Sequence, residues 1–505
     1  MLRPRRSPGI PVSEVPSSDF LGTAPIGKLL LKFSIPAVLA SVVNALYSLV
    51  DVLYLAHFQS GMEEAGRGAL VAGLTVTLPY TMALASFGVL VGAGSAALLS
   101  IRLGEGDHEG AEKIVGQTVA LKVLFFLAVP AAAYLLMEPS LRLFGATDTA
   151  IPYARSYLRV ILLGSLFLNL GFGLSGLIRA EGNATMSMAM MVAGAAVNML
   201  LDPVFIFGGF GMPWLEIGGR PLFIDFGLPR GGIAGAAWAT NIAMCLSTCM
   251  GLAYLCSRRS PVRLRLARIR IYPKLAARVF AIGLSPALLQ VMLCFVQSTF
   301  LRGYRTWGGE EADLYVAAAG IIHNVHVFVL VPTASIATAA QPIIGYNFGA
   351  GNTVRTMSCL RKTLYAAWSC GMAAFLFLMV FAPAIARAFT SDPVVLRKTA
   401  WGMRVISGGF WFYGPDFALG SYMQSVGRAR ASVTISLLRQ FFFLVPLVWF
   451  LPPLLAHFGG HAADGVWYAQ PISDITSSVI CLVWLRRVLA GRMTKNDGTP
   501  FARVL

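Results

Sequence analysis

Charged residues are scarce in this chain of 505 residues, and acidic residues are the scarcest. Only 12% of the residues are charged, with 23 Asp and Glu against 40 Lys and Arg, while 56% are hydrophobic. A soluble protein of this length carries about twice that charged fraction, so the composition argues against a soluble fold. The net charge of +17 is more simply explained by basic loops of a membrane protein than by nucleic-acid binding.

The cysteines also lack the spacing of a functional motif. No Cys-x-x-Cys pair occurs, and most of the seven cysteines lie in apolar stretches. We therefore expect free buried thiols, with neither disulfides nor a metal centre. The first 27 residues lack the apolar core of a signal peptide, so we expect them to form a disordered cytoplasmic tail.

Long apolar runs recur along the whole sequence. Runs of 18 or more apolar residues predict membrane-spanning helices, and the short alternating segments of an outer-membrane barrel are not visible. The sequence predicts an all-α polytopic membrane protein with twelve spans. We expect these spans at residues 29–56, 71–101, 118–136, 157–179, 186–207, 233–256, 279–301, 314–343, 363–382, 404–426, 431–457 and 465–489.

A basic stretch in the middle of the chain indicates the topology. Residues 258–278 carry eight Lys or Arg and no acid, which predicts a cytoplasmic loop. Twelve spans place both termini on that same side. We expect a disordered tail, an N-terminal lobe, a basic cytoplasmic linker, a C-terminal lobe and a second cytoplasmic tail, at residues 1–27, 28–257, 258–278, 279–490 and 491–505.

The two halves of the chain resemble each other. Several residues recur at a constant offset of 245, and flanking positions recur at 250 and 230. The matches are Arg159 with Arg404, Gly104 with Gly349, Gly106 with Gly351, Gly182 with Gly427, Pro36 with Pro286, and Gly235 with Gly465. Six spans per half give the halves the same orientation, which predicts two pseudo-symmetric lobes around a central cleft. This arrangement is more typical of a transporter than of a receptor or an anchor.

Four aspartates, and no glutamate, fall well inside the expected spans. A carboxylate at such depth costs roughly 2.5 kcal/mol or more, so it usually faces a cavity or a partner. At about 1.5 Å of rise per residue, two of them share the outer half of the first lobe with a threonine and an asparagine. These four residues are Asp51, Asn198, Asp202 and Thr240.

This outer group suggests a site for a small cation. Two carboxylates, an amide and a hydroxyl are hard oxygen ligands, and one carboxylate could equally store a proton. The alternative for Asp202 is local hydrogen bonding to the backbone where Pro203 disturbs the helix.

The second lobe carries charges of both signs. Asp416 follows Gly414 and Pro415, and we expect it to face the cleft between the lobes. Arg439 and Asp474 could neutralise each other, although their expected depths differ by about 13 Å. His323 and His326 share a helix face, either as polar packing residues or as half of a metal site. Walls containing Met188, Met190 and Met191 would suit apolar cations, as would ordinary helix packing.

Several motifs together resemble those of the multidrug and toxic compound extrusion (MATE) family. The resemblance covers nearly the whole chain, and the run AQPIIGYNFGAG at 340–351 is its most specific part. The other motifs are IP at 35–36, LVD at 49–51, RLGEG at 102–106, RAEGN at 179–183, NMLLDP at 198–203, GAAWAT at 235–240, LRQ at 438–440 and PISD at 471–474.

This resemblance implies a secondary antiporter that exports organic, often cationic, compounds in exchange for H⁺ or Na⁺. It implies Asp51, Asn198, Asp202 and Thr240 as the cation site, and a monomer in the bacterial inner membrane without a cofactor or catalytic residues. The Asp416 carboxylate departs from the family pattern. We expect the substrate cavity to involve Gln341, Asp416, Arg439 and Asp474.

Two other functions remain as alternatives. A flippase for lipid-linked or polysaccharide precursors would need a strongly cationic cavity, whereas the charge expected inside these spans is mostly acidic. A membrane-embedded enzyme would need a catalytic cluster, which His323 and His326 alone do not supply.

Overall fold

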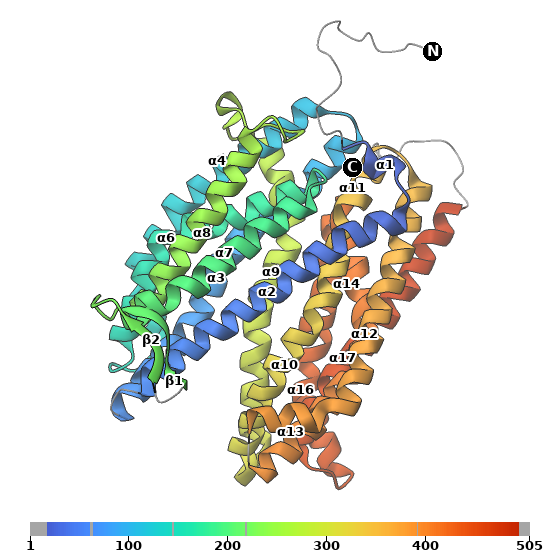
Figure 1. Cartoon of the computed structure of the whole chain (residues 1–505). Helices are drawn as coiled ribbons and strands as arrows, with labels where there is room; N and C mark the ends of the chain where they lie inside the picture. The colour runs from blue at the N-terminus through green and yellow to red at the C-terminus, as the bar shows by residue number, and fades with distance from the viewer. Residues whose placement is uncertain (1–17, 61–63, 144–145, 218–219, 391, 494–505) are drawn as a thin grey trace, which may run out of the picture.

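The computed structural model describes residues 18–60, 64–143, 146–217, 220–390 and 392–493, which are almost entirely helical. Two groups of helices stand side by side (Figure 1). The N-terminal lobe consists of α1 (Phe20–Thr23), α2 (Ile26–Ser60), α3 (Glu64–Gly104), α4 (His108–Leu135), α5 (Met137–Leu143), α6 (Ile151–Ala180), α7 (Ala184–Phe207), β1 (Gly209–Ile217), β2 (Arg220–Asp225) and α8 (Gly232–Cys256).

The C-terminal lobe follows a linker that contains the short 3-10 helix η1 (Leu266–Arg268). Its elements are α9 (Pro273–Trp307), η2 (Gly309–Glu311), α10 (Ala312–Ala339), α11 (Gln341–Gly349), α12 (Thr353–Phe389), α13 (Pro393–Ser407), α14 (Phe410–Ser425), α15 (Ala429–Leu437), the π-helix η3 (Leu438–Leu444), α16 (Val445–His457) and α17 (Ala462–Met493).

The all-α polytopic membrane fold predicted from the sequence is confirmed. Within the described ranges, ten stretches are long and apolar enough to cross a bilayer. The two other expected spans correspond to α13 with α14, which are separated at Gly408 and Gly409, and to α17.

The repeat has a physical counterpart at the start of α4 and α12. Asp107 and Asn352, 245 residues apart, each accept a hydrogen bond on Oδ1 from the backbone N–H three residues later, at 2.8 Å and 3.1 Å. Each residue follows a glycine in the left-handed region, Gly106 at φ 73° and Gly351 at φ 71°. The same turn and the same helix cap therefore begin both helices.

The lobes share a hydrophobic core at only one end of the molecule, the end where the helices adjacent to both termini lie. That shared core combines residues such as Leu98 of α3 with Ile343 of α11. Towards the opposite end the cores are separate, with Leu158 in one lobe and Trp467 in the other. The lobes are therefore joined at the terminal end and part towards the other end (Figure 1).

Glycines allow the lobes to meet closely at this seam. A Cβ on Gly104 would lie 1.9 Å from the carbonyl oxygen of Tyr346, and a Cβ on Gly349 would lie 2.1 Å from that of Ile101. The offset of 245 exchanges these two contacts with each other. The pseudo-twofold axis therefore passes between α3 and α11, where no side chain fits.

The N-terminal segment is ordered where we expected a tail. Within residues 18–27, α1 forms and α2 begins, while residues 1–17 lie outside the described ranges. Asn347 Nδ2 donates to the carbonyl oxygen of Leu21 at 3.0 Å, and Arg355 Nη2 donates to that of Ala24 at 2.7 Å. Buried backbone carbonyls need such donors, and here the C-terminal lobe supplies them.

Other boundaries also differ from the expectation. The glycine-rich segment before α8 forms an antiparallel hairpin of β1 and β2, in which Phe210 pairs with Ile224. Alternating apolar residues in the two strands favour a hairpin over the irregular loop that glycine and proline suggested.

The α9 helix begins at Pro273, inside the expected linker, and α17 continues to Met493. The rest of the C-terminal tail, from 494, lies outside the described ranges.

Gly349→Ala should lower the melting temperature of the purified protein by at least about 2 °C, because the new Cβ meets backbone that cannot rotate away. The control is Gly320→Ala within α10, where a Cβ would have nothing within 4 Å. Scanning fluorimetry in detergent measures both variants. Equal melting temperatures for Gly349→Ala and the wild type would contradict a tight seam.

Candidate cation and substrate sites

Three of the four residues expected to bind the cation are joined by hydrogen bonds in the N-terminal lobe. Asn198 Nδ2 donates to Asp202 Oδ1 at 3.2 Å and to Thr240 Oγ1 at 3.4 Å. The Thr240 hydroxyl donates in turn to the carbonyl oxygen of Ala236. The α7 helix continues through Pro203 to Phe207, so Asp202 lies inside a helix and not at its end.

Three of the four residues have a buried oxygen atom without a donor. Asp51 Oδ1, Asn198 Oδ1 and Asp202 Oδ2 accept no hydrogen bond. Asp51 lies on α2, which packs against α7. Buried acceptors without partners are costly, and a proton or a small cation can satisfy such oxygens.

The hairpin lies against the outer end of the same lobe. Trp214 stacks on His57 of α2 at 3.9 Å between ring centroids and packs edge-on to Tyr54. Phe207 at the end of α7 joins this cluster. Aromatic packing thus holds together the ends of the helices that carry Asp51 and Asp202.

The C-terminal lobe contains a buried network of both charges. Arg439 Nη1 lies 3.4 Å from Asp474 Oδ1, and Gln470 donates to both oxygens of that carboxylate at 3.1 Å. The guanidinium also lies over the ring of Tyr413, at 4.5 Å. The pairing that the expected depths left undecided therefore forms. Those depths were counted from the ends of separate expected spans, and they did not include the packing of α17 against η3, which contains Arg439.

Asp416 is only partly satisfied. Ser477 Oγ donates to its Oδ2 at 2.7 Å, while Oδ1 is buried without a partner. Asp416, Gln341 and Arg439 line a cavity of about 140 Å³. Asp474, the fourth residue expected at the substrate cavity, lies behind this wall, bonded to Arg439.

The two histidines of α10 do not form a metal site in the described part of the chain. His323 Nε2 lies 2.9 Å from the amide of Gln297, and His326 Nε2 lies 3.2 Å from the hydroxyl of Tyr413. The geometry favours the packing interpretation, with His326 joining the C-terminal network through Tyr413.

The N-terminal lobe has a cavity of about 130 Å³, between α2, α6 and α7. Several of its lining residues correspond to those of the C-terminal cavity by the internal repeat. The corresponding pairs are Pro36 with Pro286, Phe172 with Phe417, Arg179 with Gln424, and Ser187 with Ser432. Both lobes therefore leave a space behind the proline of their first long helix, and the side chains around that space differ.

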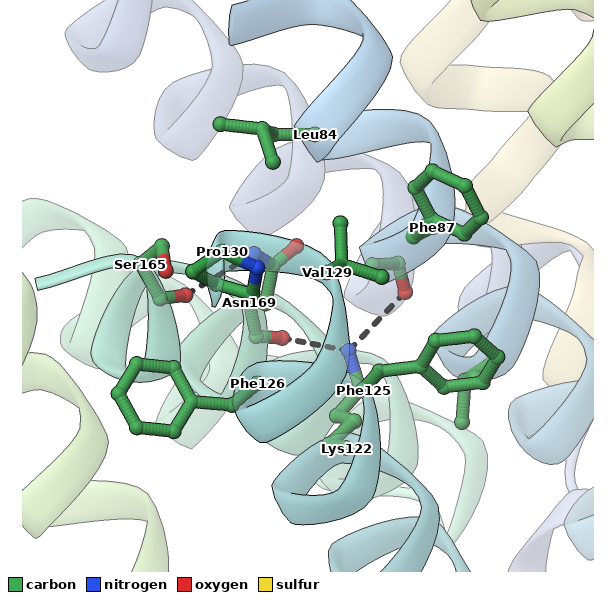
Figure 2. Close-up of a pocket in the computed structure, with 11 residues that line it drawn as sticks. Leu84, Phe87, Lys122, Phe125, Phe126, Val129, Pro130, Ser165 and Asn169 are labelled. Carbon is green, nitrogen blue, oxygen red and sulfur yellow. Dashed lines mark hydrogen bonds between the residues drawn. The ribbon is translucent and has the colours of Figure 1, made fainter. Parts of the chain in front are cut away.

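A buried lysine holds three helices of the N-terminal lobe together (Figure 2). Lys122 Nζ donates to the carbonyl oxygens of Gly88 at 3.0 Å and Asn169 at 2.5 Å. Its carbon chain lies against Gly173, where an added Cβ would come within 2.2 Å of Lys122 Cε. Lys122 therefore joins α4 to the place where α3 and α6 cross.

Sequence reasoning assigned no role to Lys122 or Arg179, although it considered Arg439 inside the spans and included Arg179 in the motif RAEGN at 179–183. A basic residue in an apolar span is also costly, and this signal was present in the sequence for both.

Glu181 was also missed, and it lies outside the spans, between α6 and α7. Ser260 Oγ donates to its Oε2 at 2.9 Å, while Oε1 is buried without a partner. Burial raises the pKa of this carboxyl to about 8, because the ionised form loses its hydration.

The fold and its buried polar groups together define a class of protein. Two repeated helical lobes in the membrane, joined at one end and carrying partnerless acceptors inside the spans, are typical of a secondary transporter. The family model described as MatE matches residues 36–204 and 281–450, more than half of the chain. The protein belongs to the MatE family, as the sequence motifs predicted.

Similar proteins extend over nearly the whole chain. The FAD transporter of Shewanella oneidensis is 24% identical over 92% of this chain and 96% of its own. The multidrug export protein MepA of Staphylococcus haemolyticus is 21% identical over 85% and 88%. The structure of a MATE family multidrug resistance transporter in an outward-facing conformation has a TM-score of 0.83, with 21% identity over 96% of this chain and 100% of that one.

Glu181→Gln should remove part of the pH dependence of stability. The unfolded carboxyl titrates near 4.5, so between that pH and about 8 the folded protein holds a proton that the unfolded chain releases. The stability linked to this proton is fully present below about pH 4.5 and is lost as pH rises through about 8. It amounts to a few kcal/mol at most, on the order of the shift itself.

Melting curves from pH 5 to 9 measure this effect. The melting temperature of the wild type should fall more steeply with rising pH than that of Glu181→Gln. Parallel curves would show that Glu181 does not retain its proton in the folded protein.

Gly173→Ala should destabilise the protein by roughly 1–3 kcal/mol, because the new Cβ overlaps the Lys122 chain. Adding Lys122→Ala should recover part of that loss, since the double substitution removes the clash. The matched control is Gly176→Ala, one turn later on α6, where a Cβ meets only ordinary contacts. Melting temperatures of the four variants and the wild type give the coupling, and purely additive effects would contradict the contact.

Proposed function

We propose that this protein is a secondary active multidrug antiporter that exports small organic compounds in exchange for H⁺ or Na⁺. Membership of the MatE family and the multidrug exporters among its relatives support export. The observation that carries the coupling is the set of three buried oxygens without donors on Asp51, Asn198 and Asp202. Family likeness alone would leave the site undefined.

The proposed coupling acts through α2. Cation binding neutralises the repulsion between Asp51 on α2 and Asp202 on α7, so it favours packing of α2 against the lobe. Loss of the cation leaves two carboxylates in an apolar environment and favours a different position of α2. The cation drives transport only if its affinity differs between these two arrangements.

The two cavities are the proposed places for the exported compound. In the C-terminal lobe, Asp416 presents a partnerless oxygen beside Gln341, which suits a cationic or hydrogen-bond-donating compound. Arg439 adds little positive charge there, because Asp474 pairs with it. That balance disfavours a flippase for anionic lipid-linked precursors.

The orientation follows from the basic linker. Eight Lys or Arg in residues 258–278 favour the cytoplasmic side of the bacterial inner membrane for the end where the lobes join. The closed seam then lies at the cytoplasm, and the structure corresponds to an outward-facing state. We propose that the protein works as a monomer without a cofactor, since each lobe carries its own cavity.

Asp51→Asn should reduce gradient-driven export of ethidium from vesicles by at least about tenfold, because an amide cannot exchange a proton or bind Na⁺ as strongly. The control is Asp313→Asn, an exposed acid at the start of α10. Export is measured under a proton gradient and a sodium gradient separately, which names the coupling ion. Undiminished export by correctly inserted Asp51→Asn would refute the coupling role.

A further inference from the structure

An arginine without a partner lines the cavity of the N-terminal lobe. Arg179 lies in the last turn of α6. Within the described ranges its guanidinium contacts neither a carboxylate nor any hydrogen-bond acceptor. The other enclosed basic groups differ, since Arg439 pairs with Asp474 and Lys122 donates to two carbonyls.

A guanidinium that lines a cavity without an acceptor is only partly hydrated, so a group that can accept its hydrogen bonds would stabilise it. Arg179 is partly exposed, and the cavity it lines is where a compensating group can reach it. An anion satisfies a guanidinium best, through two parallel N–H···O bonds to a carboxylate or a phosphate.

The remaining walls fit an aromatic compound that carries such an anion. The cavity of about 130 Å³ is close in size to the cavity of about 150 Å³ that holds a benzene ring in another protein. Phe172, Met188 and Met191 supply an apolar, polarisable surface. A second, smaller cavity shares Phe172 and Met191 with it, so a longer compound has room to extend.

Serine hydroxyl groups that can donate a hydrogen bond also line this cavity. Ser175 and Ser187 are 2.7 Å apart, and their shared hydrogen bond leaves one hydroxyl hydrogen to donate. Ser41 accepts from Ser335 at 2.9 Å, which leaves its own hydrogen free. The three serines line the same cavity as Arg179 and together have two hydroxyl hydrogens that could be donated to an anion.

The internal repeat shows that this charge belongs to one lobe. Gln424 occupies the position of Arg179 in the C-terminal lobe and bonds to Gln341 at 3.1 Å. The partnerless group in that cavity is instead the acceptor oxygen of Asp416. The N-terminal cavity therefore offers donors to a ligand, and the C-terminal cavity offers an acceptor.

We propose that Arg179 is a specificity-determining residue, which binds the anionic group of a carboxylated or phosphorylated aromatic substrate in the N-terminal lobe. This proposal rests on the proposed export function, because the bound anion is a substrate only if the protein exports it. It extends that function to organic anions, with the C-terminal cavity serving cations.

Two single-ring compounds of similar size and opposite charge, benzoate and benzylamine, test the proposal. Each is titrated with purified protein in a neutral detergent, and binding is followed by isothermal titration calorimetry. Arg179→Gln should weaken benzoate binding at least about tenfold and leave benzylamine binding unchanged, while Arg179→Lys should give an intermediate loss. Asp416→Asn should show the reverse preference.

The substitution Arg179→Gln suits this test because the equivalent position in the other lobe already holds Gln424. Equal losses for both compounds, or unchanged benzoate affinity in Arg179→Gln, would overturn the proposal. So would failure of the wild type to bind benzoate where benzylamine binds.

A competition arm separates a substrate from a lipid headgroup. Displacement of benzoate by phosphatidylglycerol, but not by phosphatidylcholine, would assign the site to lipid and overturn the assignment to an exported compound. The binding assay does not depend on transport. Arg179-dependent binding without benzoate export in vesicles would therefore refute the export function while leaving the anion site standing.

Discussion

The two lobes meet backbone to backbone at glycines of α3 and α11, and the rest of the architecture depends on that contact. Gly104 and Gly349 each stand where a Cβ would meet a carbonyl oxygen of the opposite lobe. Because these contacts lie at the terminal end, one shared core forms there and separate cores form at the other end. The seam acts as the joint of two rigid bodies, and the N-terminal segment, bonded to Asn347 and Arg355, reinforces it.

Buried polar side chains without hydrogen-bond partners are candidates for functional residues in this fold. A helical membrane protein satisfies its backbone within each helix, so the remaining polar deficits belong to side chains. Among the described residues, oxygens of Asp51, Asn198 and Asp202 in one lobe and of Asp416 in the other are buried without a partner, as are atoms of other side chains such as Gln440 and Trp467. Arg179 is the matching deficit of opposite sign. Lys122 shows the contrasting case, in which a charged residue finds two carbonyls and becomes a structural crosslink.

The sequence predicts the helical membrane fold and the repeat, because span length and the 245-residue offset are properties of the chain itself. It also indicates that Asp51, Asn198, Asp202 and Thr240 share a depth. The hydrogen bonds among Asn198, Asp202 and Thr240 are seen only in the structure. Prediction fails where a contact depends on how helices pack against one another. Arg439 and Asp474 pair in the structure, and a depth count along separate spans cannot show this. The order of residues 18–23 depends on contacts with the distant α11 and α12, which no local pattern reveals.

Comparison of equivalent positions explains how one duplicated lobe gave rise to two different sites. The counterpart of Asp416 is Gly171, where a Cβ would lie only 2.8 Å from the Thr248 hydroxyl, so the N-terminal lobe has no room for that carboxylate. The counterpart of Arg439 is Gly194, and the counterpart of Asp51 is Leu301. Turns, caps and the seam are retained in both halves because they determine packing. The charged positions are not retained, so the two lobes present different charged and polar side chains around the same turns and the same seam.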